Sequence, residues 1–227
     1  MMQAIQSERT AALVGRRFFL LFLFLLATLI LYPYAEASRF GYYAFRVIGS
    51  FAILVSVYAA KIHRSLLLLA IVLAVPALLH RIVPPKADAS LFSMFNIVLS
   101  FVFDVVIAVV IFRHVFAREK PDSETIFGAL CIYLMVGFSF ASVYEMVAAF
   151  QPHAFYLDPR TNLHVIPDRF DFIFYSFGTM TSLGSAGITA VSSQARSVTV
   201  LEALLGVLYL AVLIARLMGA YRPDGRV

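Results

Sequence analysis

Long runs of apolar residues recur along the whole chain and leave few folds open to it. Each run is about 20 residues long, which is the length an α-helix needs to cross a hydrocarbon layer roughly 30 Å thick. We expect membrane-spanning helices at residues 18–34, 42–60, 65–82, 91–113, 125–149 and 197–219. With 62% hydrophobic and only 14% charged residues, the chain has too little polar surface for a water-soluble domain. The sequence therefore predicts an all-α membrane protein with six transmembrane helices.

One further apolar segment, residues 168–180, lies between the fifth and sixth expected helices. It is too short to span a membrane, so we interpret it as a re-entrant half-helix. Irregular backbone at membrane depth is tolerated only where protein surrounds it or where it lines a watery cavity. The loop at residues 181–189 is therefore expected to line such a cavity. The loop at 151–167, which is rich in turn residues, is expected to form an outer turret.

The basic residues predict how the chain is oriented, because cytoplasmic loops of membrane proteins are enriched in Lys and Arg. With the N-terminus inside, the inner side holds eleven of the 18 basic residues, namely Arg9, Arg16, Arg17, Lys61, Arg64, Arg113, Arg118, Lys120, Arg216, Arg222 and Arg226. Both termini are therefore expected to be cytoplasmic. The net charge of +5 fits this bias and contact with membrane lipids. The basic residues are too dispersed to predict nucleic-acid binding.

The first apolar run has a second interpretation. Arg16 and Arg17, the run at 18–32 and the small residues Ala35 and Ala37 also fit a cleavable secretory signal. Removing it would leave five spans and would not change the predicted sidedness of the pore.

The loop after the half-helix carries a recognisable motif. It reads T-S-L-G-S-A-G from Thr181 to Gly187, and Arg196 and the segments 201–206 and 208–216 follow without a gap. This pattern resembles the pore helix, selectivity filter and inner helix of the bacterial tetrameric potassium channel family, whose filter reads T-T-V-G-Y-G-D. The resemblance implies a pore domain at 121–227, a homotetramer with one pore loop per chain, and a bacterial inner membrane. The aligned filter residues are Thr181, Ser182, Leu183, Gly184, Ser185, Ala186 and Gly187.

Several of these filter residues depart from the family. A potassium filter replaces the ion's water with rings of backbone carbonyls and a hydroxyl from each of four chains. Ser182 can supply the hydroxyl, and Gly184 keeps the freedom to adopt positive φ. Ala186 stands at the second glycine, where a Cβ at positive φ would cost about 1 to 2 kcal/mol per chain. Ser185 and Gly187 replace the family's tyrosine and aspartate, and the chain has no Trp for the family's aspartate–tryptophan brace.

We therefore expect a wider or more mobile filter that passes K+, Na+ or both with reduced or lost potassium selectivity. Three alternatives stay open. Gly184 and Gly187 could frame a filter one residue longer, or the filter could tolerate Ala186 and remain selective for potassium. The filter could also collapse and leave a non-conducting structural or regulatory membrane subunit.

Four residues near the loop are candidates for supporting or gating the pore. Gly206 is either the hinge that the resemblance implies or a site of close helix packing. Glu202 is a carboxylate inside a membrane span and therefore a functional candidate. It either accepts hydrogen bonds behind the filter or faces the cavity and attracts cations. Phe174 and Tyr175 either support the filter from behind or are ordinary apolar anchors.

Residues 1–120 are expected to form a four-helix region without a voltage sensor. Such a sensor needs several arginines spaced three apart, and the segment 91–116 offers only Arg113.

Two acidic residues, Asp104 and Glu145, lie in or near expected spans and require partners. Conceivable partners are Lys61, Arg64 and Arg113. The two carboxylates are either structural ion pairs or part of a ligand or proton site.

The sequence gives no indication of catalysis, of a cofactor or of a metal site. Cys131 is the only cysteine, and the five His residues are scattered. The nucleotide-binding, esterase and metalloprotease motifs are absent from the sequence. We expect that the chain is not an enzyme.

Overall fold

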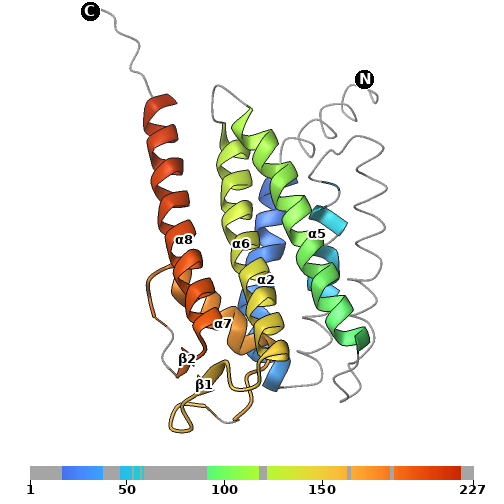
Figure 1. Cartoon of the computed structure of the whole chain (residues 1–227). Helices are drawn as coiled ribbons and strands as arrows, with labels where there is room; N and C mark the ends of the chain where they lie inside the picture. The colour runs from blue at the N-terminus through green and yellow to red at the C-terminus, as the bar shows by residue number, and fades with distance from the viewer. Residues whose placement is uncertain are drawn as a thin grey trace, which may run out of the picture. The chain divides into compact units, whose positions relative to one another are not determined.

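The structure is a computed structural model that describes residues 17–37, 47–52, 54–56, 58, 91–117, 122–162, 165–184 and 187–220. Helix α2 spans Arg17–Ala37, and two longer helices follow, α5 at Leu91–Phe116 and α6 at Ser123–Phe150. Figure 1 shows these helices and the segment that comes after them. That segment contains strand β1 (Phe155–Leu157), helix α7 (Arg169–Met180), strand β2 (Ile188–Ala190) and helix α8 (Ser193–Ala220).

Three helices in the described part of the chain are long and apolar enough to cross a membrane: Ile97–Phe116, Ser123–Phe150 and Ser193–Gly219. They confirm long apolar helices at the expected spans 91–113, 125–149 and 197–219, which are thus candidate membrane spans. The expected span at 18–34 falls on α2, and the described residues of 42–60 are helical. The expected span at 65–82 lies outside the described residues. A total of six spans therefore stays a prediction, and so does the re-entrant position of α7.

The chain divides into two compact units, one of Met1–Val83 with Val106–Leu134 and one of Pro84–Val105 with Met135–Val227. Helices α5 and α6 each run through both units. The boundary at residue 120 that the sequence suggests stays a prediction.

In the first unit, Phe18 of α2 is buried and lies close to Gly128 of α6. Gly128 of α6 permits a close approach, because a Cβ there would lie 2.6 Å from Val115 of α5 and 3.4 Å from the Phe18 ring. The thiol of Cys131 donates to the Phe18 carbonyl at 3.3 Å. The buried position of Cys131 agrees with a structural role.

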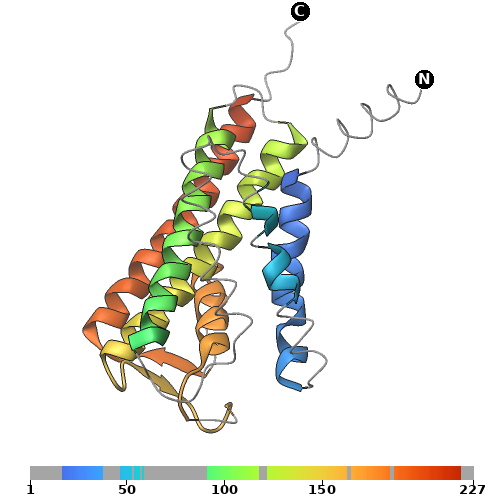
Figure 2. The same ribbon diagram turned by 90° about the vertical axis from the view of Figure 1, so that its right-hand side faces the viewer.

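The second unit contains the expected pore elements. Helix α7 packs against α8, and β1 and β2 lie at the end of the unit where α8 begins (Figures 1 and 2). An aromatic cluster fills the space between them. The Tyr144 ring of α6 lies 4.9 Å from that of Tyr175 and 5.5 Å from that of Phe155, and the Phe155 ring lies 5.1 Å from that of Phe172.

The two-stranded sheet departs from the all-α expectation. Strands β1 and β2 pair antiparallel, with Phe155 opposite Ala190 and Leu157 opposite Ile188. These four residues are buried. Strands of three residues are too short to show an alternating pattern in sequence, so hydropathy alone does not reveal them.

Helix α7 begins with a complete capping box. The Asp168 side chain accepts from the backbone N–H groups of Phe170 at 2.8 Å and Asp171 at 3.0 Å. In return, the Asp171 carboxylate accepts from the Asp168 N–H at 2.8 Å. Four backbone N–H groups at a helix start lack partners within the helix, and this arrangement satisfies several of them. The cap therefore fixes where the half-helix starts.

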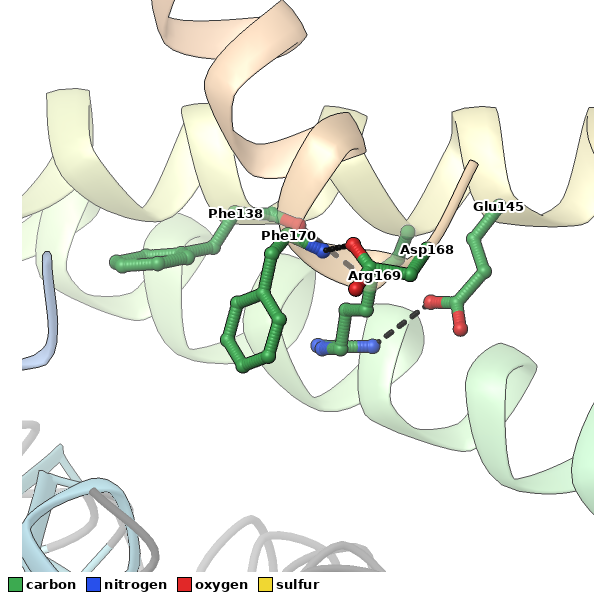
Figure 3. Close-up of polar contacts among 6 residues, drawn as sticks. Phe138, Glu145, Asp168, Arg169 and Phe170 are labelled. Carbon is green, nitrogen blue, oxygen red and sulfur yellow. Dashed lines mark hydrogen bonds and ion pairs between the residues drawn. The ribbon is translucent and has the colours of Figure 1, made fainter. Parts of the chain in front are cut away.

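An ion pair attaches this helix start to α6. Arg169 Nη1 lies 2.8 Å from Glu145 Oε2, and Figure 3 shows the two side chains pointing toward one another. Glu145 therefore pairs with Arg169, which was not among the expected partners, and of those partners Lys61 and Arg64 lie outside the described residues. Sequence could not identify this pairing, because it depends on how α7 packs beside α6.

We predict that Asp168→Ala lowers the free energy of unfolding by about 1 kcal/mol, because the α7 N–H groups lose their side-chain acceptor. Asp168→Asn should keep most of the stability, since Asn is an equally good N-cap residue. Thermal unfolding in detergent micelles measures both. Equal unfolding temperatures for the Ala variant and the native chain would contradict a stabilising role of the cap.

Candidate functional site

The backbone after α7 changes handedness from residue to residue. Thr181 ends the helix with φ of −89°, Ser182 has φ of 57° and Gly184 has φ of 81°. Leu183, between them, does not have positive φ. Alternating handedness turns successive carbonyl groups toward one side of the chain, and L residues with a Cβ are penalised at positive φ. The described residues 181–184 of the motif therefore alternate in handedness, with positive φ at Ser182 and Gly184.

Hydrogen bonds connect the described residues of this loop to the end of α7. The Thr181 hydroxyl donates to the Phe177 carbonyl at 2.6 Å, and the Gly184 N–H donates to the Gly178 carbonyl at 3.2 Å. Residues 181–184 are exposed in the single chain, with Leu183 at 78%. Ser185 and Ala186 lie outside the described residues.

A serine at position 182 suits this geometry. Positive φ is uncommon for any residue with a Cβ, and for β-branched residues it is an outlier. Serine has no β-branch, so it adopts this backbone at lower cost than threonine would and still provides a hydroxyl.

A buried polar cluster is centred on Glu202 of α8. Its side chain is fully buried. It accepts hydrogen bonds from the Tyr144 hydroxyl of α6 and from Ser176 Oγ of α7, the second at 2.5 Å. Ser176 Oγ also lies 2.7 Å from the Gly137 carbonyl oxygen of α6. One carboxylate thus connects α6, α7 and α8 inside the unit.

A second pair of hydroxyls lies beside the Glu202 cluster. The Tyr175 hydroxyl of α7 and Thr199 Oγ1 of α8 are 2.9 Å apart. Tyr175 is 4% exposed, whereas its neighbour Phe174 is 46% exposed. Of the two aromatic candidates, Tyr175 is buried and Phe174 lies on the surface of the single chain. Support of the loop by either residue stays a prediction.

Gly206 lies against the end of α7. A Cβ at this position would be 2.8 Å from the carbonyl oxygen of Met180 and 3.2 Å from its Cα. The structure therefore shows the close packing that was one of the two interpretations of Gly206. Hinge bending at Gly206 stays a prediction. The contact lies one turn after Glu202 on α8 and one turn after Ser176 on α7, so the two helices run in parallel with matched register.

Gly187, at the end of the motif, is hydrogen-bonded to the loop at 151–167, and the position of this loop as an outer turret stays a prediction. The Gly187 carbonyl accepts from the Asp158 N–H at 2.8 Å and from Asn162 Nδ2 at 2.9 Å. Sequence reasoning did not find Asn162. The only signal available was the richness of residues 151–167 in turn formers, which marks a loop but not what the loop contacts.

Helix α8 leaves much of its apolar surface uncovered in one chain. In the most apolar stretch of α8 only 17% is buried, against 56% in the most apolar stretch of α6. At about 3.6 residues per turn, the exposed apolar residues occupy more than half of the helix circumference. They are Val200, Leu201, Leu204, Leu205, Val207, Leu208, Leu210, Val212, Ile214 and Met218. Such a surface requires lipid, other protein chains or both.

Comparison with known proteins gives one family match. Residues 123–222 match the model of a family described as ion channel, which is a two-helix channel domain. The match includes α6, α7 and α8 with the strands and the loop between them. No curated protein and no solved structure matches the chain. The family match supports an ion channel pore domain in a membrane protein.

We predict that Gly206→Ala lowers the free energy of unfolding by about 1 to 3 kcal/mol, because the new methyl group overlaps the Met180 backbone. Gly219 is the matched control, since a Cβ there has no neighbour within 4 Å. Gly219→Ala should be neutral or slightly stabilising, because Ala favours helix more than Gly does. Thermal unfolding of both variants in detergent measures this. Equal unfolding temperatures for the two variants would show that the close contact of Gly206 with Met180 does not affect stability.

We also predict that Glu202→Ala destabilises the fold, because it leaves the buried Tyr144 hydroxyl without the acceptor described above, whereas Ser176 keeps the Gly137 carbonyl. A buried hydroxyl without an acceptor costs about 1 to 3 kcal/mol. Glu202→Gln should be milder, since Gln keeps a carbonyl acceptor of the same size. Denaturant or thermal unfolding ranks the three proteins. An Ala variant as stable as the Gln variant would overturn the assignment of Glu202 as a shared acceptor.

Proposed function

We propose that the chain forms a cation channel, in which four copies surround a pore and the loop after α7 is the ion path. The observation that carries this proposal is the alternation of φ between Ser182 and Gly184 at the carboxyl end of α7, within a region that matches an ion channel family. A filter built from backbone carbonyls needs this alternation to direct its oxygen atoms toward one axis.

The half-helix α7 adds an electrostatic contribution. The carboxyl end of a helix carries partial negative charge, equivalent to about half an elementary charge. Helix α7 ends at Met180, directly before the loop. In a four-fold assembly, four such ends would face a common cavity and stabilise a monovalent cation there.

In a homotetramer, the apolar surface of α8 would contact both lipid and neighbouring copies of the chain. One loop cannot enclose an ion, and a carbonyl ring of this type takes one loop from each of four chains. The apolar surface of α8, uncovered over more than half of its circumference, is wide enough to contact both lipid and neighbouring copies. In this arrangement α8 lines the inner pore and can act as its gate.

The outer end of the loop supports reduced selectivity. The Gly187 oxygen already accepts two hydrogen bonds, and a carbonyl oxygen has two lone pairs. Gly187 therefore does not provide an extra carbonyl for ions, which disfavours a longer filter framed by Gly184 and Gly187. The ion path is then limited to Thr181, Ser182, Leu183, Gly184, Ser185 and Ala186. Because selectivity depends on the number and field strength of coordinating groups, such a path discriminates weakly between K+ and Na+.

The location follows from the same reasoning. The basic residues favour the orientation in which both termini are cytoplasmic, and the resemblance to bacterial channels favours an inner membrane.

We predict that the purified protein in planar bilayers carries a current that reverses near zero voltage when potassium faces sodium. Reversal at the potassium equilibrium potential would contradict the loss of selectivity. A variant with Ala186→Gly and Ser185→Tyr should move the reversal toward that potential, since it restores two residues of the family motif.

The same recording tests the alternative of a non-conducting subunit. If the native chain is silent while the variant conducts, the native loop does not form an ion path and the channel function fails.

A further inference from the structure

The turret is hydrogen-bonded directly to the loop that we assign as the ion path. We propose that Asn162 is a positioning residue of this path, which clamps the outer end of the loop through Gly187. The contacts of Asp158, Thr161 and Asn162 with Gly187 are called the outer clamp below. The role in ion passage rests on the proposed channel function, whereas the clamp itself does not.

Asn162 connects two segments that are far apart in sequence. Its Nδ2 atom lies 2.9 Å from the Gly187 carbonyl oxygen and 3.0 Å from the Asp158 carbonyl oxygen. It also lies 3.2 Å from Thr161 Oγ1. Because an amide group has two hydrogens, it can donate to both carbonyls at once. The side chain thereby joins the turret turn to the loop.

The position of Gly187 requires a glycine. Its φ of 104° lies in the region that other residues rarely adopt. In addition, a Cβ there would lie 2.5 Å from Thr161 Oγ1 and 2.9 Å from Asn162 Nδ2. The turret turn and the loop thus approach each other so closely that no side chain fits between them.

The clamp extends a sheet that is anchored in the core of the unit. Leu157 is opposite Ile188 in the sheet, and the next backbone hydrogen bond runs from the Asp158 N–H to the Gly187 carbonyl at 2.8 Å. Phe155 of β1 is buried against Tyr144 and Tyr175. The clamp therefore has a rigid base, which a surface loop alone would not provide.

The loop is consequently held at both ends. Its inner end follows Met180, which packs against Gly206, and its outer end is Gly187. In the resembling family an aspartate–tryptophan brace would hold the outer end, and this chain has no Trp. The outer clamp occupies the corresponding end of the loop from the turret side. It fixes the distance that the intervening backbone must span and hence the arrangement of its carbonyl groups.

Hydrogen exchange tests the clamp without requiring conduction. We expect Asn162→Ala and Asn162→Asp to raise the exchange rate of loop amides at Gly184 and Gly187–Thr189 by about tenfold, because the donors to Gly187 and Asp158 are lost. Unchanged exchange in α6 and α8 reports in the same experiment that each variant is folded. Unchanged exchange in the loop would overturn the clamp.

The matched control is Arg160→Ala in the same turn. Arg160 is exposed and bonds to Asp158 Oδ1 through its backbone N–H at 2.9 Å, which Ala retains. It should leave loop exchange at the native rate. A tenfold rise in this variant as well would show that any change in the turn loosens the loop and would overturn the specific role of Asn162.

Bilayer recording then tests the role in ion passage. In the Asn162 variants we expect a changed single-channel conductance, with the Arg160 variant unchanged. If the Asn162 variants show faster loop exchange but the conductance of the native protein, the positioning role is overturned. The existence of the clamp would still be supported by the exchange result. A silent native protein would overturn the channel function, and the exchange experiment would still decide whether the clamp exists.

Discussion

The packing of α6, α7 and α8 in the second unit depends on one buried carboxylate. Glu202 lies in an apolar helix, where a carboxylate without hydrogen-bond donors is costly to bury. Its two hydroxyl donors come from different elements, Tyr144 of α6 and Ser176 of α7. The carboxylate is satisfied only when all three helices are in place, so it sets the register of α7 against α8. The contact between Met180 and Gly206 follows from this register, one turn further along both helices.

The loop after α7 is fixed at its two ends and exposed between them. Both ends are fixed by packing or hydrogen bonds, whereas the described residues between them are exposed in one chain. Exposed backbone at membrane depth is acceptable where it faces water or ions. A loop of this kind can serve as an ion path. In sequence the loop differs from the resembling family, because Ser185 stands where that family carries a tyrosine and the chain has no Trp.

Hydropathy and local motifs were sufficient to predict helices α6, α7 and α8. The lengths of α6 and α8 follow from their apolar runs, and the short apolar segment marks α7. Gly184 was expected to allow positive φ, and its φ of 81° agrees. A carboxylate within a span also identified Glu202 as a candidate, although not its partners.

The contacts between distant segments could not be predicted. Tyr175 and Phe174 are adjacent aromatic residues, and only the packed face of α7 decides which of them is buried. The pairing of Glu145 with Arg169 depends on the same packing. The bond from Asn162 to Gly187 joins a side chain to a backbone carbonyl, which leaves no periodic signal in sequence.

Chemical modification at Leu183 tests most directly whether the loop after α7 carries ions. The only native cysteine, Cys131, is buried, so Leu183→Cys would introduce a single exposed thiol in the described residues, at a position that is 78% exposed. A charged, membrane-impermeant thiol reagent should abolish the current of this variant and leave that of the native protein unchanged. A labelled variant that still conducts at its full unlabelled level would show that ions do not pass along this loop.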